Sequence, residues 1–343
     1  MASRLMRVAE YAGVSEATVS RVLNGKPGVA EATRASVLTA MDVLGYERPV
    51  PLRGRANPLV GLVVPEMGNP VFPAYTEVIG SGLARGGYTS ILCTGTAAGV
   101  RESDFADTLL EHQVAGVIFV SGEHSLTSRD HGHYVRLRER GLPAVVINGV
   151  ADGLDLPCLS TDDAASVRLA VRHLVQLGHV RIGLAVGDLD HIPAARKAQA
   201  FRDETAILAG HRGHGDAERF IAPTLYSLEG GSAAAMRLFR EGVTAVVCGS
   251  DVLALGVIQA ARRSGLDVPG DVSVVGFDDS AFMPFADPPL TTIRQPIDAL
   301  GLAAVNVLLC QVSGKPIGDT DEMLFAPELV VRASTGSAPR RRP

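Results

Sequence analysis

The sequence has no tryptophan, aromatic residues make up only 5 % of its 343 residues, and its four cysteines include no CxxC pair. No apolar run reaches the roughly 18 to 20 residues of a membrane-spanning helix, and charged residues interrupt the N-terminus where a signal peptide has its apolar core. The widely spaced cysteines argue against a disulfide-rich secreted scaffold. A hydrophobic content of 46 % argues against intrinsic disorder. We expect a soluble cytoplasmic protein with reduced cysteines and no membrane association.

The charge is distributed unevenly along the chain. The overall formal charge is −5, but residues 1–57 carry eight basic and five acidic side chains, a net charge of +3 that leaves −8 for the rest. A small basic region on an acidic body suggests that only this region approaches a polyanion such as nucleic acid. An ordinary solvated face can carry the same excess, so the charge alone leaves both interpretations open.

Residues 1–46 have the pattern of three short helices. Apolar residues at helical spacing predict a first helix that stops at Gly13. Ser15 is placed to cap a second helix that ends at Leu23, and a third helix is predicted over residues 31–44. Two short helices joined by a tight glycine turn, with a third packed against them, are typical of a helix-turn-helix module. Residues 47–58 (ERPVPLRGRANP) are rich in proline and arginine and are predicted to form a basic linker.

Beyond residue 58, short aliphatic strands alternate with amphipathic helices. Strands are predicted at residues 60–64, 89–93, 116–120, 144–147, 182–186, 219–221, 245–248 and 272–275. Helices of the second half are predicted at residues 163–177, 194–209, 231–240 and 251–264. Continuous aliphatic strands separated by helices imply parallel sheets covered on both faces. The fold class is therefore a small all-α head followed by an α/β body of two doubly wound lobes, with a ligand cleft at the carboxyl ends of the strands.

Six segments, in order along nearly the whole chain, carry a family resemblance. They are VAEYAGVSEATVSRVLNGKPGV (8–29), GLVVPEMGNPVF (61–72), HLVQLGHVRIGL (173–184), GSDVLALG (249–256), VPGDVSVVGFDDS (268–280) and PPLTTIRQP (288–296). Together they resemble the lactose repressor and galactose repressor (LacI/GalR) family of bacterial transcription regulators. The resemblance implies a homodimeric repressor of a palindromic double-stranded DNA operator. It also implies a body similar to periplasmic sugar-binding proteins, with a small effector, a sugar or sugar derivative, between the lobes.

A division of the body follows from this resemblance, with chain crossings expected near Ser160, Leu290 and Met323. The expected N-terminal lobe comprises residues 59–160 and 290–323, the C-terminal lobe comprises residues 161–289 and 324–332, and a disordered tail comprises residues 333–343. This tail has no apolar heptads, so we expect dimers and not coiled-coil tetramers.

The second helix is expected to read DNA from the major groove. Its exposed first turn and next-turn residue present Glu16, Ala17 and Arg21 to base edges, where arginine can donate two hydrogen bonds to a guanine. The resemblance implies phosphate contacts from Ser15, Thr18, Ser20 and Asn24. The alternative is that these side chains are plain helix surface, with Arg21 in a solvated ion pair.

The linker departs from the family pattern. The resemblance places a minor-groove wedge at Leu52, followed by Arg53, but about one helical turn of the usual linker is missing and Pro51 lacks an amide donor. We therefore expect a weakened wedge. In the first helix, Arg4 and Arg7 replace the usual capping threonine and first-turn aspartate, which removes a favourable contact with the helix dipole.

Ligand recognition is carried over from the family position by position. Sugar hydroxyls need fixed carboxylates and amides, and an apolar ring face stacks on an aromatic side chain. The expected effector-binding residues are Phe72, Asn148, Arg196, Lys197, Tyr226, Ser250 and Asp278. The family's basic residue falls on Lys197, and the adjacent Arg196 is a possible substitute. Each has an ordinary structural alternative: a turn cap for Asp278, core packing for the aromatics and solvent exposure for Lys197.

No cofactor, metal ion or catalytic group is expected. Histidines 124, 131 and 133 lie in a hydrophilic stretch and are expected to be solvated and not metal ligands. Two other functions are compatible with an α/β body. A sugar-binding protein without a DNA role is disfavoured by the helix-turn-helix and the absent signal peptide. An α/β sugar-metabolising enzyme is disfavoured because no GxSxG, P-loop, HExxH or paired catalytic carboxylate stands out.

Overall fold

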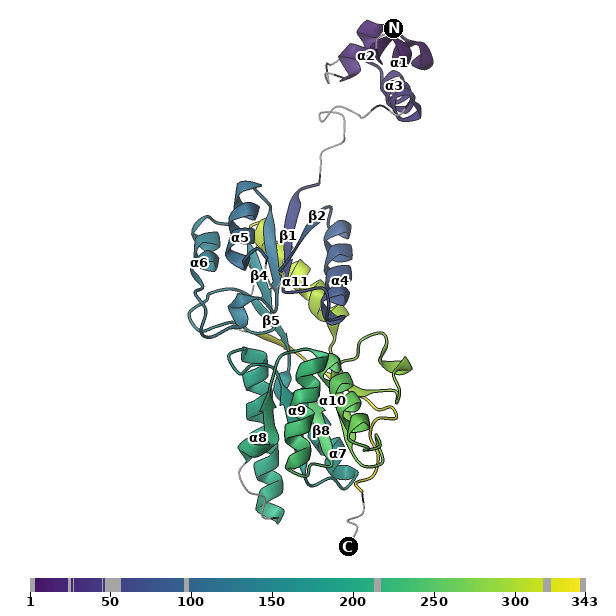
Figure 1. Cartoon of the computed structure of the whole chain (residues 1–343). Helices are drawn as coiled ribbons and strands as arrows, with labels where there is room; N and C mark the ends of the chain where they lie inside the picture. The colour runs from purple at the N-terminus through teal and green to yellow at the C-terminus, as the bar shows by residue number, and fades with distance from the viewer. Residues whose placement is uncertain are drawn as a thin grey trace. The chain divides into compact units, whose positions relative to one another are not determined.

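The computed structural model describes residues 4–23, 26, 28–44, 46, 57–95, 99–212, 217–316 and 322–339. The chain forms two compact units, a head (Met1–Pro58) and a body (Leu59–Pro343), shown in Figure 1. Three residues predicted to contact DNA, Asn24, Leu52 and Arg53, lie outside the described residues.

The head consists of three helices, as predicted: α1 (Arg4–Ala12), α2 (Glu16–Leu23) and α3 (Glu31–Val43). Their shared core is formed by Val8, Ala9, Val19, Val22, Val37, Ala40 and Met41. Gly13 has a φ of +64°, a conformation in which glycine carries no steric cost, and this ends α1. The Ser15 hydroxyl accepts a hydrogen bond from the Thr18 amide at 3.2 Å, which confirms Ser15 as the cap of α2.

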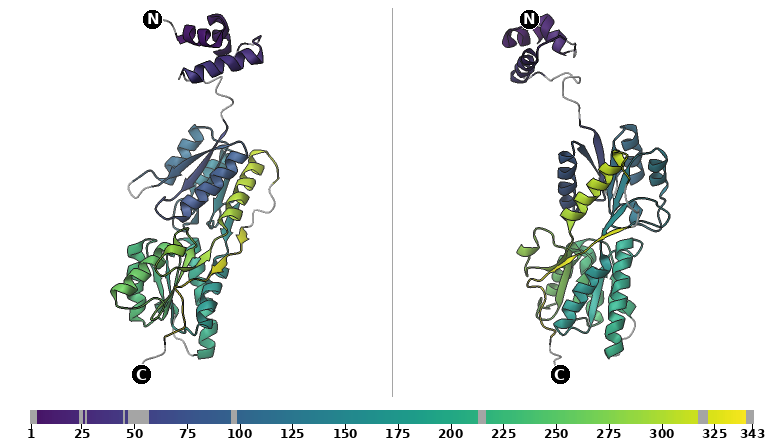
Figure 2. Two further views of the ribbon diagram at one scale, coloured as in Figure 1. Left: turned by 90° about the vertical axis from the view of Figure 1, so that its right-hand side faces the viewer. Right: turned by 180° about the vertical axis from the view of Figure 1, so that it is seen from behind.

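The N-terminal lobe of the body is built on a parallel sheet with the strand order β11-β5-β4-β3-β1-β2. The strands are β1 (Leu59–Val64), β2 (Thr89–Thr94), β3 (Gly116–Val120), β4 (Ala144–Ile147), β5 (Cys158–Thr161) and β11 (Met323–Phe325). The helices are α4 (Val71–Arg85), α5 (Glu102–Glu111), α6 (Gly132–Glu139) and α11 (Ile297–Val312). Two apolar clusters show that α4 and α11 cover one face and α5 and α6 the other (Figure 2).

The C-terminal lobe repeats this plan with the strand order β12-β10-β9-β8-β6-β7. The strands are β6 (Ile182–Val186), β7 (Ile221–Pro223), β8 (Ala245–Cys248), β9 (Ser273–Asp278), β10 (Thr291–Arg294) and β12 (Glu328–Val330). The helices are α7 (Asp163–Gln176), α8 (Ile192–Arg212), α9 (Leu228–Arg240) and α10 (Asp251–Arg263). Only β12 runs antiparallel to its neighbour among these described strands. The predicted class of two doubly wound lobes is confirmed.

One predicted strand is misplaced. Residues 217–220 form a short 3-10 turn, and the strand β7 follows at Ile221–Pro223, so the prediction at residues 219–221 is wrong. Strands β5, β10, β11 and β12 were not predicted: β5 (CLST) and β10 (TTIR) contain polar residues that interrupt the aliphatic pattern, and β11 and β12 have only three residues each and are partly exposed. Such short strands depend on pairing with partners that are distant in the sequence.

The chain crosses between the lobes three times, each time slightly later than predicted. Strand β5 pairs within the N-terminal sheet, so the first crossing follows Thr161. The crossing expected near Leu290 is wrong, because β10 pairs with β9 of the C-terminal sheet and the chain leaves that lobe only after Arg294. The third crossing follows Phe325, because β11 pairs with β5.

The expected disordered tail is also wrong for residues 333–339. Ser334 is fully buried, and its hydroxyl donates to the Val274 carbonyl at 2.6 Å. The Ala338 amide donates to the Leu177 carbonyl at 2.9 Å, at the end of α7. This segment is polar in sequence, but it satisfies backbone groups of the C-terminal lobe. No helix in the described part of the chain is long and apolar enough to span a membrane.

Candidate functional site

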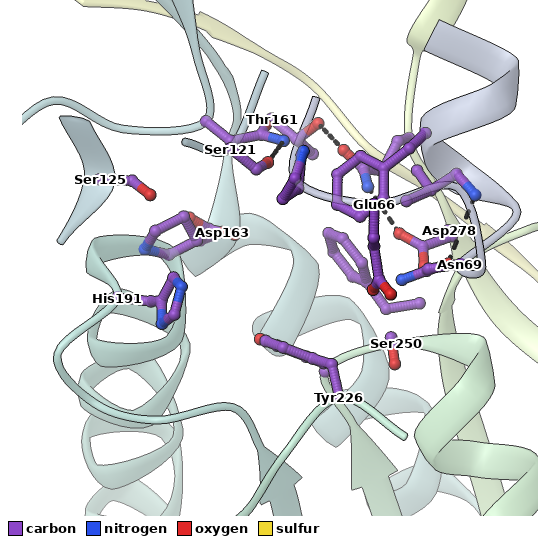
Figure 3. A pocket seen from close by; sticks show the side chains of 18 of the residues that line it. Glu66, Asn69, Ser121, Ser125, Thr161, Asp163, His191, Tyr226, Ser250 and Asp278 are labelled. Atoms are coloured by element: carbon purple, nitrogen blue, oxygen red, sulfur yellow. Dashed lines mark hydrogen bonds between the residues drawn. The ribbon is translucent and has the colours of Figure 1, made fainter. Parts of the chain in front are cut away.

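A cavity of about 700 Å³ lies between the two lobes, a volume typical of small-molecule sites. Its walls come from the carboxyl ends of the parallel strands, as the doubly wound fold predicts. Polar lining residues at or just after these ends include Glu66, Ser121, Asn148, Thr161, Asp163, Ser250, Asp278 and Gln295. Figure 3 shows Glu66, Asn69, Ser250 and Asp278 toward one end of the cavity and Ser125 and His191 toward the other.

Asp278 is a buried carboxylate at this cavity. It ends β9 with a φ of +120° and is 5 % exposed. Its Oδ1 accepts a hydrogen bond from Gln295 Nε2 at 2.6 Å, whereas its buried Oδ2 has no partner among the described residues. Burial, reinforced by the nearby Asp251 carboxylate, raises the pKa of Asp278 well above its ordinary value. A ligand hydroxyl that forms a hydrogen bond with Oδ2 would satisfy this atom.

Gln295 connects Asp278 to the N-terminal lobe. Its Oε1 accepts hydrogen bonds from the Tyr75 hydroxyl at 3.1 Å and the Thr161 hydroxyl at 2.9 Å. Because Gln295 follows β10 at a chain crossing, a single side chain links α4, β5 and the end of β9. The sequence analysis missed this residue, although it stands within the PPLTTIRQP segment.

Lys197 lines the cavity in a buried ion pair with Asp163, the first residue of α7. The ammonium group also lies 4.1 Å from the centre of the Phe277 ring, a cation-π distance. Desolvation lowers the pKa of Lys197, but the Asp163 charge more than compensates, so the net shift is upward and the ammonium stays charged. The solvent-exposed alternative for Lys197 is therefore wrong. Asp163, which the sequence analysis missed, also lines the cavity.

Arg196 does not line the cavity, contrary to its predicted place in the site. Its guanidinium makes two hydrogen bonds to Glu322, at 2.7 and 2.6 Å. Neighbouring residues on a helix point about 100° apart, so α8 can direct only one of these two basic side chains into the cavity. It directs Lys197 there.

Phe72 and Tyr226 line the cavity from opposite lobes, in the positions expected of stacking walls. Tyr226 lies so close to the backbone after β6 that a Cβ atom at Gly187 would be 2.1 Å from its ring. Asn148 lines the cavity with a φ of +72°, and its amide donates to Ser121 at 2.8 Å. Ser250 also lines it, but its hydroxyl caps α10 by accepting from the Leu253 amide at 3.2 Å.

His191 was not predicted in the site. It lies next to Ser125 at the opposite end of the cavity from Asp278, and its Nδ1 is buried without a partner among the described residues (Figure 3). Burial lowers the pKa of His191, so its imidazole is neutral near pH 7. Its only sequence signal was its place shortly after β6.

Two of the three histidines that were predicted to be solvated are instead internal. His124 is fully buried and His133 is 3 % exposed. His124 Nε2 lies 3.0 Å from the Ile147 carbonyl oxygen, and His133 Nε2 lies 3.3 Å from a Glu102 carboxylate oxygen. The expectation of solvation is wrong for His124 and His133, whose side chains are enclosed in the N-terminal lobe, whereas His131 is half-buried.

The head presents the predicted DNA-reading residues to solvent. Glu16, Ala17 and Arg21 are exposed on α2, while Val19 and Val22 of the same helix are buried. Ser15 is exposed, and Thr18 and Ser20 are half-buried at the edge of this surface. A helix with one face packed and its N-terminal turn exposed has the arrangement that a recognition helix needs.

Comparisons with known proteins match both units. A model of bacterial regulatory proteins of the lacI family matches residues 5–49, and a model of a periplasmic binding protein-like domain matches residues 171–335. The HTH-type transcriptional regulator MalR of Streptomyces coelicolor is 53 % identical over 342 residues, covering 100 % of this chain and 99 % of the relative.

Two solved structures are similar over nearly the whole chain. The transcriptional regulator CelR-cellobiose complex matches with a TM-score of 0.71 and 30 % identity, covering 97 % of this chain and 100 % of that chain. The Lac repressor dimer bound to operator and the anti-inducer ONPF matches with a TM-score of 0.74 and 29 % identity, covering 98 % of this chain and 100 % of that chain. The chain belongs to the LacI family of bacterial transcriptional regulators.

Proposed function

We propose that this protein represses transcription from a palindromic operator and that a small uncharged sugar, bound between the lobes, controls its operator affinity. The observation that carries the proposal is the interlobe cavity with the buried Asp278 carboxylate, one of whose oxygens has no partner. A buried carboxyl oxygen without a hydrogen-bond partner is costly, and a sugar hydroxyl, which can both donate and accept, is a partner of the right kind.

The rest of the lining fits a sugar ring. The Asn148 amide and the Lys197 ammonium provide donors, and Phe72 and Tyr226 provide apolar faces from the two lobes. A ligand that contacts both walls binds the closed arrangement of the lobes better than an open one. Such differential affinity is what allows a ligand to shift a conformational equilibrium.

The charges in the cavity favour an uncharged ligand. Among the described lining residues, Lys197 is the one lysine or arginine, and Asp163 already neutralises it. Glu66 and Asp278 add further carboxyl groups. A phosphorylated sugar would meet acidic groups without a cation free to pair with it.

The relatives support the same function. The CelR structure contains cellobiose, and the Lac repressor structure is a dimer on its operator. We infer that this chain likewise forms a homodimer, so that two heads reach half-sites about one helical turn of DNA apart. Sedimentation at micromolar concentration without DNA tests this, and a monomer would contradict it.

Thermal shift and calorimetry against cellobiose, maltose, glucose and glucose 6-phosphate test the effector class. A neutral sugar at about 100 times its Kd should stabilise the protein by about 2.7 kcal/mol, and the phosphorylated sugar should not bind. Asp278→Ala should weaken sugar binding by about 2 kcal/mol or more. The matched control is Asp203→Ala, which removes an exposed carboxylate on α8 that accepts a within-helix hydrogen bond from Gln199.

Operator binding is measured in parallel on a site selected from random duplex DNA. The Asp278→Ala protein should bind this DNA normally but lose its response to sugar. Unchanged sugar affinity in Asp278→Ala would remove Asp278 from the site. The bound sugar should be recovered chemically unchanged, and the appearance of a product would favour the enzyme alternative.

A further inference from the structure

The two lobes touch at a place where no chain crossing lies. There, residues 125–128 of the N-terminal lobe meet residues 188–191 of the C-terminal lobe. Leu126 and His191 form an isolated antiparallel bridge, and the Thr127 amide donates to the Asp190 carbonyl at 3.1 Å. The three crossings lie elsewhere in the sequence, after Thr161, Arg294 and Phe325.

The Asp190 carboxylate gathers three hydrogen bonds from the opposite lobe. Its Oδ1 accepts from the Thr127 hydroxyl at 2.5 Å and from the Ser128 amide at 2.9 Å, and its Oδ2 accepts from the Ser128 hydroxyl at 2.5 Å. The Asp188 carboxylate accepts from the Asp190 amide at 3.0 Å and so orders the loop that carries it. Short hydrogen bonds to an ionised acceptor are the stronger kind.

This contact can break and re-form as the lobes open and close. Thr127 and Ser128 are exposed, so water competes for the same groups when the lobes separate. Among the described residues, no apolar cluster spans the two loops. The contact therefore adds to the closed arrangement without preventing the opening through which a ligand enters.

The same two loops also form one end of the cavity. Ser125 and His191 line it there, beside the residues that make the contact (Figure 3). Asp190 itself does not line the cavity. Opening of the Asp190 contact would thus move the wall that Ser125 and His191 provide.

We propose that Asp190, with Thr127 and Ser128, is an interlobe latch that closes the His191 end of the cavity over the bound sugar and slows its release. Asp190 is a positioning residue, because it acts on the ligand only through the two loops it joins. This inference rests on the proposed sugar-binding function for its effect on ligand release, but not for the contact between the loops.

The first test requires no ligand. Amide hydrogen exchange at residues 126–128 should be about tenfold faster in Asp190→Ala than in the wild-type protein, because the loop loses its partner across the lobes. Asp203→Ala, with its carboxylate bonded within α8, should exchange at the wild-type rate there. Equal protection in wild type and Asp190→Ala would overturn the latch.

The second test measures sugar release by stopped-flow displacement, using cellobiose or maltose, whichever stabilises the wild-type protein. Asp190→Ala should release the sugar about tenfold faster than the wild-type protein. The release rate of Asp190→Asn, which keeps one acceptor, should lie between these two rates. In Ser128→Cys/Asp190→Cys, oxidation should slow both entry and release, and reduction should restore exchange. Single-cysteine variants control for the native thiols.

The outcomes separate the two proposals. If the loops exchange faster in Asp190→Ala but the wild-type protein binds none of the sugars, the sugar proposal fails, whereas the contact that Asp190 makes between the lobes stands. If a sugar binds but its release rate is the same in wild type, in Asp190→Ala and in the oxidised double-cysteine protein, the latch fails and the sugar proposal stands.

Discussion

Replacement of Gln295 by leucine should destabilise the body and weaken sugar binding together. Gln295 is 7 % exposed, and its side chain makes three hydrogen bonds: one donated to Asp278 at 2.6 Å and two accepted from Tyr75 and Thr161 at 3.1 and 2.9 Å. Leucine is of similar size but can replace none of these bonds. The substitution therefore leaves three polar groups without their partner.

The cost depends on whether water can reach each group. An unsatisfied buried polar group costs about 1–3 kcal/mol. Thr161 and Asp278 line the cavity, so water can replace Gln295 there, but the Tyr75 side chain is fully buried. We therefore expect a loss in the free energy of unfolding of about 2–4 kcal/mol, below the sum of three full penalties.

Urea unfolding followed by circular dichroism measures this loss. The matched control is Gln199→Leu on α8, an exposed glutamine whose amide donates to Asp203 at 2.9 Å, and its stability should change by less than about 0.5 kcal/mol. If Gln295→Leu lost no more free energy of unfolding than Gln199→Leu, the three hydrogen bonds of Gln295 would not stabilise the contact between the lobes. Sugar affinity should fall as well, because Asp278 loses the group that orients it.

Three further predictions concern the head, the linker and pH. Arg21→Ala should lower specific operator affinity by about 1–3 kcal/mol and leave binding to random DNA nearly intact, as compared in fluorescence titrations; equal losses on both DNAs would refute a base contact. Leu52→Ala should cost less than Arg21→Ala in the same titrations, because Pro51 and Gly54 leave about one helical turn to hold the wedge; abolished binding would contradict this. Burial raises the pKa of Asp251 to about 6, so the folded state keeps this proton where the unfolded chain releases it. The contribution of this group to stability should therefore fall as pH rises from about 4 to 6. Over this range, the urea midpoint of Asp251→Asn should change less steeply with pH than that of the wild-type protein.

The sequence predicts the central strands better than the peripheral ones. The predicted bounds of β3, β4, β6 and β8 agree with the structure because each is a continuous aliphatic run that is buried on both faces. Strands β11 and β12 have three residues each and are half-exposed, so local pattern carries little signal for them. The prediction of disorder failed at residues 333–339 for the same reason, because the order of this segment comes from hydrogen bonds to distant parts of the lobe.

The sequence predicts the cavity-lining residues that follow strands, but not those that lie on helices. Asn148, Ser250 and Asp278 follow strands, and parallel strands bring their carboxyl ends to one edge of a sheet. Whether Arg196 or Lys197 faces the cavity depends on the rotation of α8 about its axis, which the sequence of α8 alone does not fix. Asp163, on α7, decides the outcome by pairing with Lys197.

Gln295 and Asp190 hold the lobes at two independent places, and this separation can be tested. Gln295 acts at a chain crossing, whereas Asp190 acts where only side chains and loop backbone join the lobes. Because Gln295 and Asp190 share no partner, the losses in the free energy of unfolding caused by Gln295→Leu and Asp190→Ala should add to within about 0.5 kcal/mol in the protein that carries both substitutions. Their effects on sugar affinity should not add, since one ligand needs both ends of the cavity closed. If the losses in stability add but the losses in sugar affinity do not, the two ends of the cavity are coupled through the bound ligand.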